Sequence, residues 1–566
     1  MRCLAFVIVV TLACGFAFAG DSDLGALQFV NSGAPAAQEP FLRGVLLLHS
    51  FEFEDAREAF VEAERADPGF ALAYWGEAMT HNHPLWREQD ADAARAALAK
   101  LAPTPEGRRA KAPTERERGY LDAVEALYGE GDKLARDLAY SEAVRQLAER
   151  YPEDLEARAF YALSILGTAQ GVRDYAVYMR AAAVAEEVFA ANPRHPGAAH
   201  YLIHSYDDPI HAPLGLRAAR TYAKIAPAAS HAQHMISHIY VALGWWEESV
   251  QSNVNAVEVS AERRARKGLG PDALNYHALQ WLAYSYLQLG RFDDAHAALE
   301  RMAGYAEESG SSRALWHRAA IRAAWIVETG GRAAPPEHGP EQTQVTGAAA
   351  DAFATGYAAI LHGEREAAEG AAARLSDRHS VAAQGPLCHQ TGVYTDVSKN
   401  DLVVVEVLRD SLRALIELAA GRTERALELL AAATAAEERL PVDFGPPAIV
   451  KPSHEIYGDV LLKLGRPAEA RVQYERALAR APRRSLALAG LARAAAALDE
   501  QAVVAATCGE IARNYARADA SVSPPAACPP LQATAPSNPA SSSPVVHSRE
   551  ATTTTSATSR GTSPSR

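Results

Sequence analysis

Small and aromatic residues recur along this chain at spacings that suit pairs of antiparallel helices. Near the N-terminus the set consists of Gly44, Ala56, Phe60, Ala63 and Pro68. Small residues let two helices approach closely, an aromatic ring fills the space between them, and proline ends the second helix because it lacks the backbone N–H that the helix needs. The spacing therefore predicts two antiparallel helices, the second of which ends at Pro68.

The same register recurs near the C-terminus, over residues 451–484, at Gly458, Leu461, Ala470, Tyr474, Ala477 and Pro482. Weaker copies start near Ser230 and Tyr276. These positions resemble the tetratricopeptide repeat (TPR) family, and the resemblance covers most of residues 37–518. It implies an all-α fold, a right-handed superhelical solenoid of helix-turn-helix units whose concave groove binds a protein or peptide ligand.

Composition divides the chain further. Residues 20–36 form an N-terminal linker, and the Gly-, Pro- and Gln-rich segment 330–345 predicts a linker between an N-terminal block, 37–329, and a C-terminal block, 346–518. From 519 to 566 the chain turns to Ser, Thr, Pro and Ala with no periodicity, which predicts a disordered tail.

The first residues have the features of an export signal. Arg2 precedes an apolar stretch, and Ala17 and Ala19 flank Phe18 in the small-x-small pattern that signal peptidase cleaves. We therefore expect residues 1–19 to be a signal peptide and the mature chain to be periplasmic or secreted. A lipoprotein signal with Cys14 lipidated is the alternative, which Thr11 disfavours because Leu is usual there. No later segment has about 18 unbroken apolar residues, so no transmembrane segment is expected.

Charge and cysteine content narrow the partners. The formal net charge of −13 and pI near 5.8 disfavour nucleic-acid binding, which requires a basic surface. Outside the signal, the cysteines are Cys388, Cys508 and Cys528, and their spacing matches no metal or redox motif. One disulfide would suit an oxidising compartment, but the sequence selects no pair.

The histidines carry the most specific pattern, since seven of the nineteen fall between His195 and His238. His200 and His204 are one helical turn apart, and His234 and His238 repeat that spacing 34 residues later, which is one TPR period. With units starting near Pro196 and Ser230, both pairs occupy positions five and nine of a first helix. The resemblance implies that these positions line the concave groove.

Two such pairs on neighbouring helices predict a metal site. Packed helices lie about 8–10 Å apart, so the four imidazoles of His200, His204, His234 and His238 could converge on one ion. Imidazole suits transition metals such as Zn, Cu or Fe. Asp208 follows His204 by four residues and is expected on the same face, as a ligand or as a hydrogen-bond partner of one.

Other histidines extend the pattern. His231 and His277 take position two of their units, which places them beside the four-histidine cluster. His49 and His83 are also 34 residues apart and suggest a second lined patch or, with Trp75 and Trp86 nearby, an aromatic-rich contact surface. Periodic histidines also arise by repeat duplication, so a hydrogen-bonded structural network and direct peptide contact stay open as interpretations beside metal binding.

The sequence contains no phosphate-binding Gly-rich loop, nucleophile elbow, His-Glu-x-x-His or Cys-x-x-Cys motif. A binding scaffold with a transition-metal site is therefore the first hypothesis for function. A metal-dependent hydrolase or oxidoreductase that uses the histidine cluster is the alternative. The segments around His200, His234 and Trp75 also resemble a group of exported bacterial TPR proteins, which implies fold and compartment but no particular activity.

Overall fold

The computed structural model describes residues 23–169, 173–332, 344–384, 397–442 and 444–528. These ranges form the following α-helices: α1 (Pro35–His49), α2 (Phe53–Ala66), α3 (Ala71–Met79), α4 (Ala91–Leu101), α5 (Pro105–Lys111), α6 (Glu115–Leu127), α7 (Lys133–Arg150), α8 (Leu155–Gly167), α9 (Tyr175–Ala191), α10 (Pro196–Ser205), α11 (Ala212–Ile225), α12 (Ser230–Ala242), α13 (Trp246–Lys267), α14 (Tyr276–Gln288), α15 (Phe292–Ser309), α16 (Ser312–Glu328), α17 (Val345–His362), α18 (Arg365–Gln384), α19 (Lys399–Ala419), α20 (Thr423–Arg439), α21 (Ser453–Lys463), α22 (Pro467–Arg480), α23 (Ser485–Ala497) and α24 (Gln501–Asn514). The described ranges also contain two 3-10 turns, η1 (Pro271–Ala273) and η2 (Tyr515–Arg517), and a hairpin of two short strands, β1 (Asn82–His83) and β2 (Glu88–Gln89). The predicted all-α fold is confirmed.

The helices pack as TPR-like pairs because an aromatic ring fills the space that two glycines leave open. Phe60 on α2 packs against Gly44 of α1 and Gly76 of α3, and a Cβ added at Gly44 would lie 2.8 Å from the ring. The equivalent residues near the C-terminus are Gly458, Tyr474 and Gly490. The repeat predicted at both ends of the chain is therefore present, and its spacing follows from this close packing.

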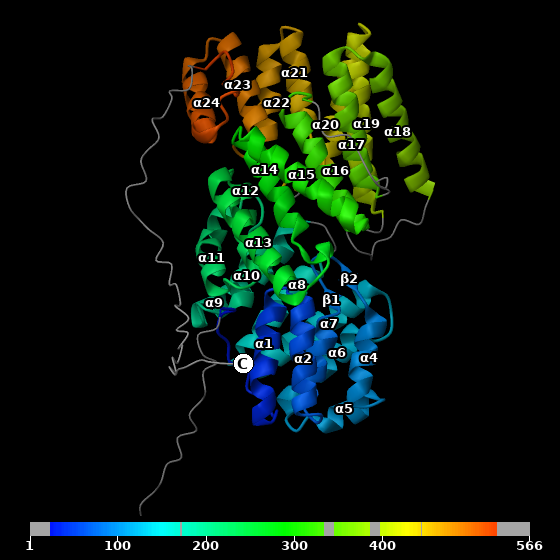
Figure 1. The fold of residues 1–566 in the computed structure, drawn as a ribbon, viewed down its shortest axis with the longest axis vertical. Coiled ribbons are helices and arrows are strands. Elements are labelled where there is room, and N and C mark those ends of the chain that lie inside the picture. Colours follow the sequence, from blue (N-terminus) through cyan, green and yellow to red (C-terminus); the bar gives the residue numbers. More distant parts are fainter. Residues whose placement is uncertain (1–22, 170–172, 333–343, 385–396, 443, 529–566) are drawn as a thin grey trace, which may run out of the picture.

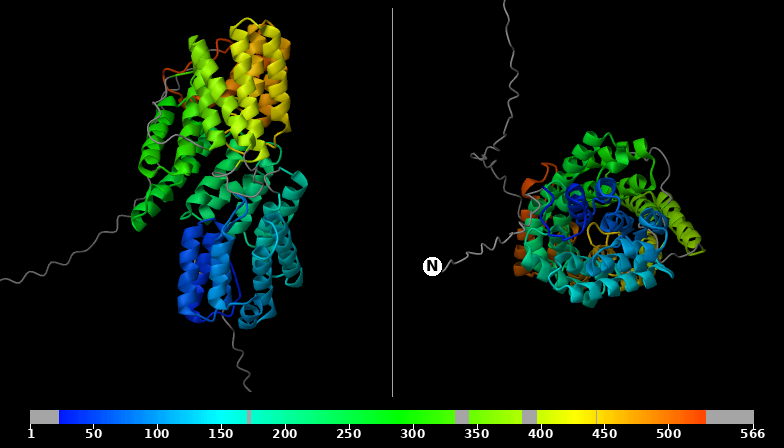
Figure 2. Two further views of the ribbon diagram at one scale, coloured as in Figure 1. Left: turned by 90° about the vertical axis from the view of Figure 1, so that its right-hand side faces the viewer. Right: turned by 90° about the horizontal axis from the view of Figure 1, so that it is seen from below.

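The helix pairs stack into two superhelical turns, one above the other in Figure 1: α1–α11 form the first, lower turn and α14–α24 the second, with α12 and α13 between them. Seen from below in Figure 2, the helices are arranged in a ring. The first turn curls back on itself, so α1 contacts α10. At that contact Gly197 lies against the imidazole of His49, and a Cβ there would collide with the ring. The N-terminal helix is thereby held directly behind the histidine-rich helices.

The second turn also closes. The hydroxyl of Ser485 on α23 donates to the backbone carbonyl of Gln288 at the end of α14 (2.6 Å), and the Trp246 indole donates to the carbonyl of Arg483 (3.1 Å). These contacts join segments about 200 residues apart in the chain. They hold the C-terminal helices against α13 and α14.

The hydrophobic core divides within α12, between Tyr240 and Val241. The predicted linker at 330–345 does not mark this division, because α16 and α17 on either side of it pack against each other in the second cluster. Residues 333–343 lie outside the described ranges. The Gly and Pro residues of this segment suggested a boundary, but the helices before and after it belong to one hydrophobic core.

The C-terminal segment is attached to the solenoid. Cys508 and Cys528 form a disulfide, which selects one of the pairings that the sequence left open, while Cys388 lies outside the described residues. The Asp519 carboxylate accepts a hydrogen bond from the backbone N–H of Asp293 in the first turn of α15 (2.9 Å). Residues 519–528 are therefore packed on the solenoid, in contrast to the disorder predicted from 519 onward, and 529–566 lie outside the described residues.

The expected signal peptide, residues 1–19, also lies outside the described ranges. Among the helices that the structure describes, none combines the length and apolar character that a membrane crossing requires.

Candidate metal centre

Six of the histidines form two adjacent triplets. In the first triplet, His200 and His204 of α10 meet His231 from the first turn of α12. The second triplet consists of His234 and His238 of α12 together with His277 of α14. Within each triplet, one nitrogen of every imidazole lies within 4.8 Å of the others, which is the arrangement that a bound transition-metal ion requires.

The two predicted histidine pairs therefore belong to two separate groups of three side chains rather than to one group of four. Each pair is completed by position two of the next first helix, and the units begin at Pro196, Ser230 and Tyr276 as the repeat register predicts. Between the two groups, the rings of His204 and His238 have centroids 5.7 Å apart. His231 and His277, predicted only as neighbours of the cluster, are thus members of it.

The first triplet is oriented from behind by α1. Nδ1 of His200 donates to the backbone carbonyl of His49 (2.8 Å). A carbonyl only accepts, so Nε2 of the neutral His200 ring bears a lone pair, and it faces Nε2 of His204 (3.0 Å) and of His231 (3.1 Å). Burial lowers the pKa of His200 to about 3, and burial likewise lowers the pKa of the other two rings well below its usual value. The triplet is therefore neutral at physiological pH.

The second triplet shows the same orientation with different partners. Nδ1 of His234 donates to Oδ1 of Asn253 (2.7 Å), whose amide is fixed because it donates to the carbonyl of Ser249 (2.8 Å). Nδ1 of His238 donates to the Asp207 carboxylate (2.5 Å). Both Nε2 atoms thus face inward, 3.1 Å apart. Two lone pairs at that distance repel unless a proton or a metal cation lies between them.

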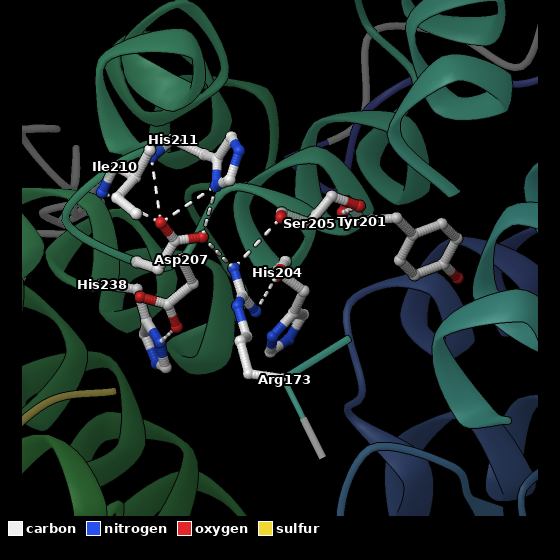
Figure 3. A network of polar contacts seen from close by, with 9 residues as sticks. Arg173, Tyr201, His204, Ser205, Asp207, Ile210, His211 and His238 are labelled. Carbon is white, nitrogen blue, oxygen red and sulfur yellow. Dashed lines mark hydrogen bonds and ion pairs between the residues drawn. The ribbon is translucent and has the colours of Figure 1, made fainter. Parts of the chain in front are cut away.

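Asp208 does not take the predicted place on the face of α10, because that helix ends at Ser205. Its carboxylate instead binds Arg173 (2.9 Å) and Nδ1 of His211 (2.9 Å), two side chains that are labelled in Figure 3. The carboxylate that contacts a clustered imidazole is the preceding residue, Asp207. Because α10 ends at Ser205 and the chain then turns, Asp207 rather than Asp208 contacts the histidine cluster.

The predicted second patch of His49 and His83 does not form. His49 is buried, its Nδ1 bonds the Tyr201 hydroxyl (2.8 Å), and its Nε2 bonds the Glu156 carboxylate (2.7 Å). His83 lies on the β1–β2 hairpin and stacks on Phe53, with ring centroids 3.9 Å apart. The two histidines therefore belong to different surroundings.

A further group of His49, Glu156 and His195 has ligand-like spacing, but its nitrogens have protein partners. Nδ1 of His195 accepts a hydrogen bond from the backbone N–H of Ala198 and so caps the N-terminus of α10. In a neutral ring the proton is then on Nε2, which faces the Glu156 carboxylate at 3.2 Å. Burial by itself raises the pKa of Glu156, but the two imidazoles outweigh it and lower that pKa to about 2. This ionised, fully buried group fastens α1, α8 and α10 behind the first triplet.

Both triplets open on one chamber of about 1010 Å³. His204, His231, His238 and His277 line the chamber, whereas His200 and His234 lie behind them, fully buried. Aromatic side chains form much of the remaining wall, namely Phe51, Phe53, Trp86, Trp281, Trp316 and Phe444. A metal ion held by three imidazoles would therefore keep an open coordination position toward the chamber, as catalytic sites do.

The pattern ends at the third unit. Positions five and nine of α14 are Gln280 and Tyr284, where α10 and α12 carry histidine. Gln280 accepts a hydrogen bond from Nδ1 of His317 (2.8 Å), and the Tyr284 hydroxyl bonds Arg484 (2.7 Å). Within the described residues, this unit carries hydrogen-bonded side chains where its neighbours carry the histidine pairs.

Several residues of the centre had no signal in the sequence pattern. Asp207, Asn253 and Glu156 orient or support the imidazoles from other helices. Trp281 packs on His238 with ring centroids 4.2 Å apart and covers the second triplet. In the sequence, Trp281 could have been recognised only as the residue one helical turn after His277 on the same helix.

No protein-family model and no curated protein matches this chain. Solved structures similar to it include the hetero-tetramer Cut9-Hcn1 of the APC/C (12% identity, 84% of this chain and 79% of that chain, TM-score 0.34) and a Rap protein complexed with competence and sporulation factor (13%, 72% and 99%, TM-score 0.35). A third is the TPR domain of P58(IPK) (11%, 82% and 99%, TM-score 0.22). At these scores the likenesses carry no argument about function.

Proposed function

We propose that this protein binds two transition-metal ions, one at each histidine triplet, and that it is a metal-dependent enzyme. Its substrate enters the chamber and reaches the open coordination positions of these ions. The observation that supports it best is the opposition of two inward-facing Nε2 atoms, those of His234 and His238, at 3.1 Å. Their Nδ1 atoms are already used by Asn253 and Asp207, so a cation between the Nε2 atoms removes the repulsion.

The ligand set narrows the choice of metal. Neutral imidazoles suit Zn, Cu, Fe and Ni, whereas Mg²⁺ and Ca²⁺ prefer oxygen ligands. Each triplet is backed by one buried carboxylate, Glu156 behind the first and Asp207 behind the second. These charges offset part of the charge of a divalent ion. The metal that binds decides between hydrolytic and redox chemistry.

The test is metal analysis of protein purified without a histidine tag. We expect about two equivalents per chain in the wild type and about one in His200→Ala or His234→Ala. His296→Ala is the matched control, since His296 lies on α15 with an exposed side chain and belongs to neither triplet. If the wild type holds no stoichiometric metal after incubation with Zn²⁺, Cu²⁺ or Fe²⁺, each tested separately, the proposal is refuted.

A binding scaffold is the second candidate, and the observation that favours it is the size of the chamber. A volume of about 1010 Å³ on the inner face of a helical solenoid is large enough to hold a peptide segment. A peptide ligand would bind equally well to metal-free protein and to the His200→Ala/His234→Ala variant. Dependence of binding on metal would favour the enzyme instead.

We also propose that the chain is exported, with cleavage after Ala19. The N-terminal pattern supports this, and the Cys508–Cys528 disulfide suits an oxidising compartment. The mass of the mature protein recovered from an expressing bacterium tests the proposal. A chain starting at Gly20 is the expected result, whereas a diacylated chain starting at Cys14 would establish the lipoprotein alternative.

A further inference from the structure

The guanidinium groups on the chamber wall are unequally paired. Of the arginines that line it, Arg173 pairs with Asp208 and Arg263 with Asp55. Arg57, Arg87 and Arg313 have no carboxylate partner among the residues that the structure describes. Arg57 is exposed to solvent, but Arg87 and Arg313 are partly buried, so each lacks both full hydration and a counter-charge.

Arg313 lies beside the second triplet. It is one helical turn from His317 on α16, and the His317 ring is 6.0 Å from that of His277, a member of the triplet. Its guanidinium lies over the Tyr276 ring (4.8 Å), and Nη2 donates to the backbone carbonyls of Asp272 and Leu274. Nε and Nη1 make no hydrogen bond to any described residue, so two donor groups are free to bind an anion.

Arg87 lines the chamber and is the sequence neighbour of Trp86, which borders the first triplet. It follows Trp86 on the β1–β2 hairpin, and the Trp86 ring is 5.6 Å from that of His231. Its φ of 59° is in the left-handed region, which costs free energy for a residue with a side chain. A strained backbone that carries an unpaired guanidinium on the chamber wall indicates a role in ligand binding.

Among the described residues, no carboxylate of the wall forms an ion pair with Arg87 or Arg313, and each of these carboxylates has another donor. The donors are the His231 N–H for Glu52, Arg263 for Glu54, Lys267 for Glu58, His83 for Glu88, His238 for Asp207, three hydroxyls for Asp272 and the Ser398 N–H for Asp401. The imidazoles of the triplets add no negative charge either. Metal ions bound to these neutral ligands would add positive charge to the inner wall.

We propose that the chamber takes an organic acid whose carboxylate is bound by Arg313 or Arg87 and whose hydrocarbon part packs on the aromatic wall beside the triplets. Trp86 and Trp281 border the first and the second triplet respectively and offer flat apolar surfaces. A guanidinium binds a carboxylate through paired, charge-assisted hydrogen bonds. The inference deepens the proposed function, since it names the substrate class of the same chamber.

The test is a binding titration with benzoate and, as its uncharged analogue, benzyl alcohol. Intrinsic tryptophan fluorescence reports occupancy, because Trp86, Trp281 and Trp316 line the chamber. The titrations use metal-free protein and protein loaded with Zn²⁺. The variants are Arg87→Gln, Arg313→Gln and the double variant, with Arg301→Gln as the matched control on α15, outside the chamber. Thermal unfolding of each variant checks that it folds.

We expect benzoate to bind at least about tenfold more tightly than benzyl alcohol, and the double variant to lose about tenfold in benzoate affinity while Arg301→Gln loses none. Equal affinity for both probes, or unchanged benzoate affinity in a folded double variant, would overturn the inference. Benzoate binding that requires Zn²⁺ but neither arginine would overturn it too. Metal analysis of the same samples reports separately on the proposed function: arginine-dependent benzoate binding by a chain that holds no metal would leave this inference standing alone.

Discussion

The imidazoles of His234 and His238 face each other through their Nε2 atoms at 3.1 Å, while their Nδ1 atoms are held by Asn253 and Asp207. One repeat earlier, the His49 carbonyl holds Nδ1 of His200, and Nε2 of His200 faces Nε2 of His204. In each case the protein holds the outer nitrogen of a ring, which directs the inner nitrogen toward its neighbours.

Asp207→Asn is expected to weaken metal binding at the second triplet by about tenfold to a hundredfold, because a hydrogen-bonded carboxylate increases the basicity of a ligand imidazole and fixes its tautomer. The first triplet should keep its affinity, so a competition titration with a chelator should show one weakened and one unchanged site. Asp174→Asn, at the N-cap of α9, is the control for loss of one negative charge nearby. Equal weakening of both sites would contradict the assignment of Asp207 to His238.

Glu156→Gln is expected to destabilise the metal-free protein at neutral pH by about 3 kcal/mol, from the lowering of the Glu156 pKa from 4.5 to about 2. The folded pKa lies below the unfolded one, so this stabilisation is fully present above pH 4.5 and is lost as the pH falls toward 2. Urea unfolding of wild type and variant at several pH values measures it. The difference in unfolding free energy should shrink as the pH decreases from 4.5; a constant difference would mean that Glu156 is not ionised in the folded chain.

Gly458→Ala is expected to cost about 1–3 kcal/mol of stability, since the added Cβ would lie 2.7 Å from the Tyr474 ring and force the two helices apart. The matched control is Gly304→Ala on α15, where a Cβ meets nothing within 4 Å. That change should stabilise the protein by about 0.5–1 kcal/mol, because alanine favours helix over glycine. Chemical denaturation of both variants tests the contrast, and equal effects would refute the close packing of α21 on α22.

Removal of the disulfide by Cys508→Ser should lower stability by about 3 kcal/mol, as expected for a closed loop of roughly 20 residues. The loss should be local at first, because residues 519–528 are held mainly by this bond and by the Asp519 contact to α15. Hydrogen exchange should therefore rise over 519–528 and leave α10 and α12 unchanged. Fast exchange of 519–528 in the oxidised wild type would contradict the packing of this segment on the solenoid.

Much of the fold and part of the site could be predicted because they depend on local spacing. The residues that define the helix pairs, such as Gly44 with Phe60, lie within a single repeat, so their pattern indicates the packing directly. The start of α12 at Ser230 and of α14 at Tyr276 follows the repeat register for the same reason. The place of Asp208 did not follow from that register, because the helix ended before it and the chain turned.

The sequence by itself determined that two histidine pairs, one repeat apart, lie on the same face of successive first helices, since a spacing of four residues is one helical turn and 34 residues is one repeat. Only the tertiary structure decided which histidine completes each pair and which carboxylate lies behind it. His277 follows His231 by 46 residues rather than 34, because α13 and the turn after it are longer than in the preceding unit, yet both take position two. The contact of His49 with α10 joins residues 151 apart in sequence and forms because the superhelix closes on itself, whereas Asp207 reaches α12 because the two lie in neighbouring repeats.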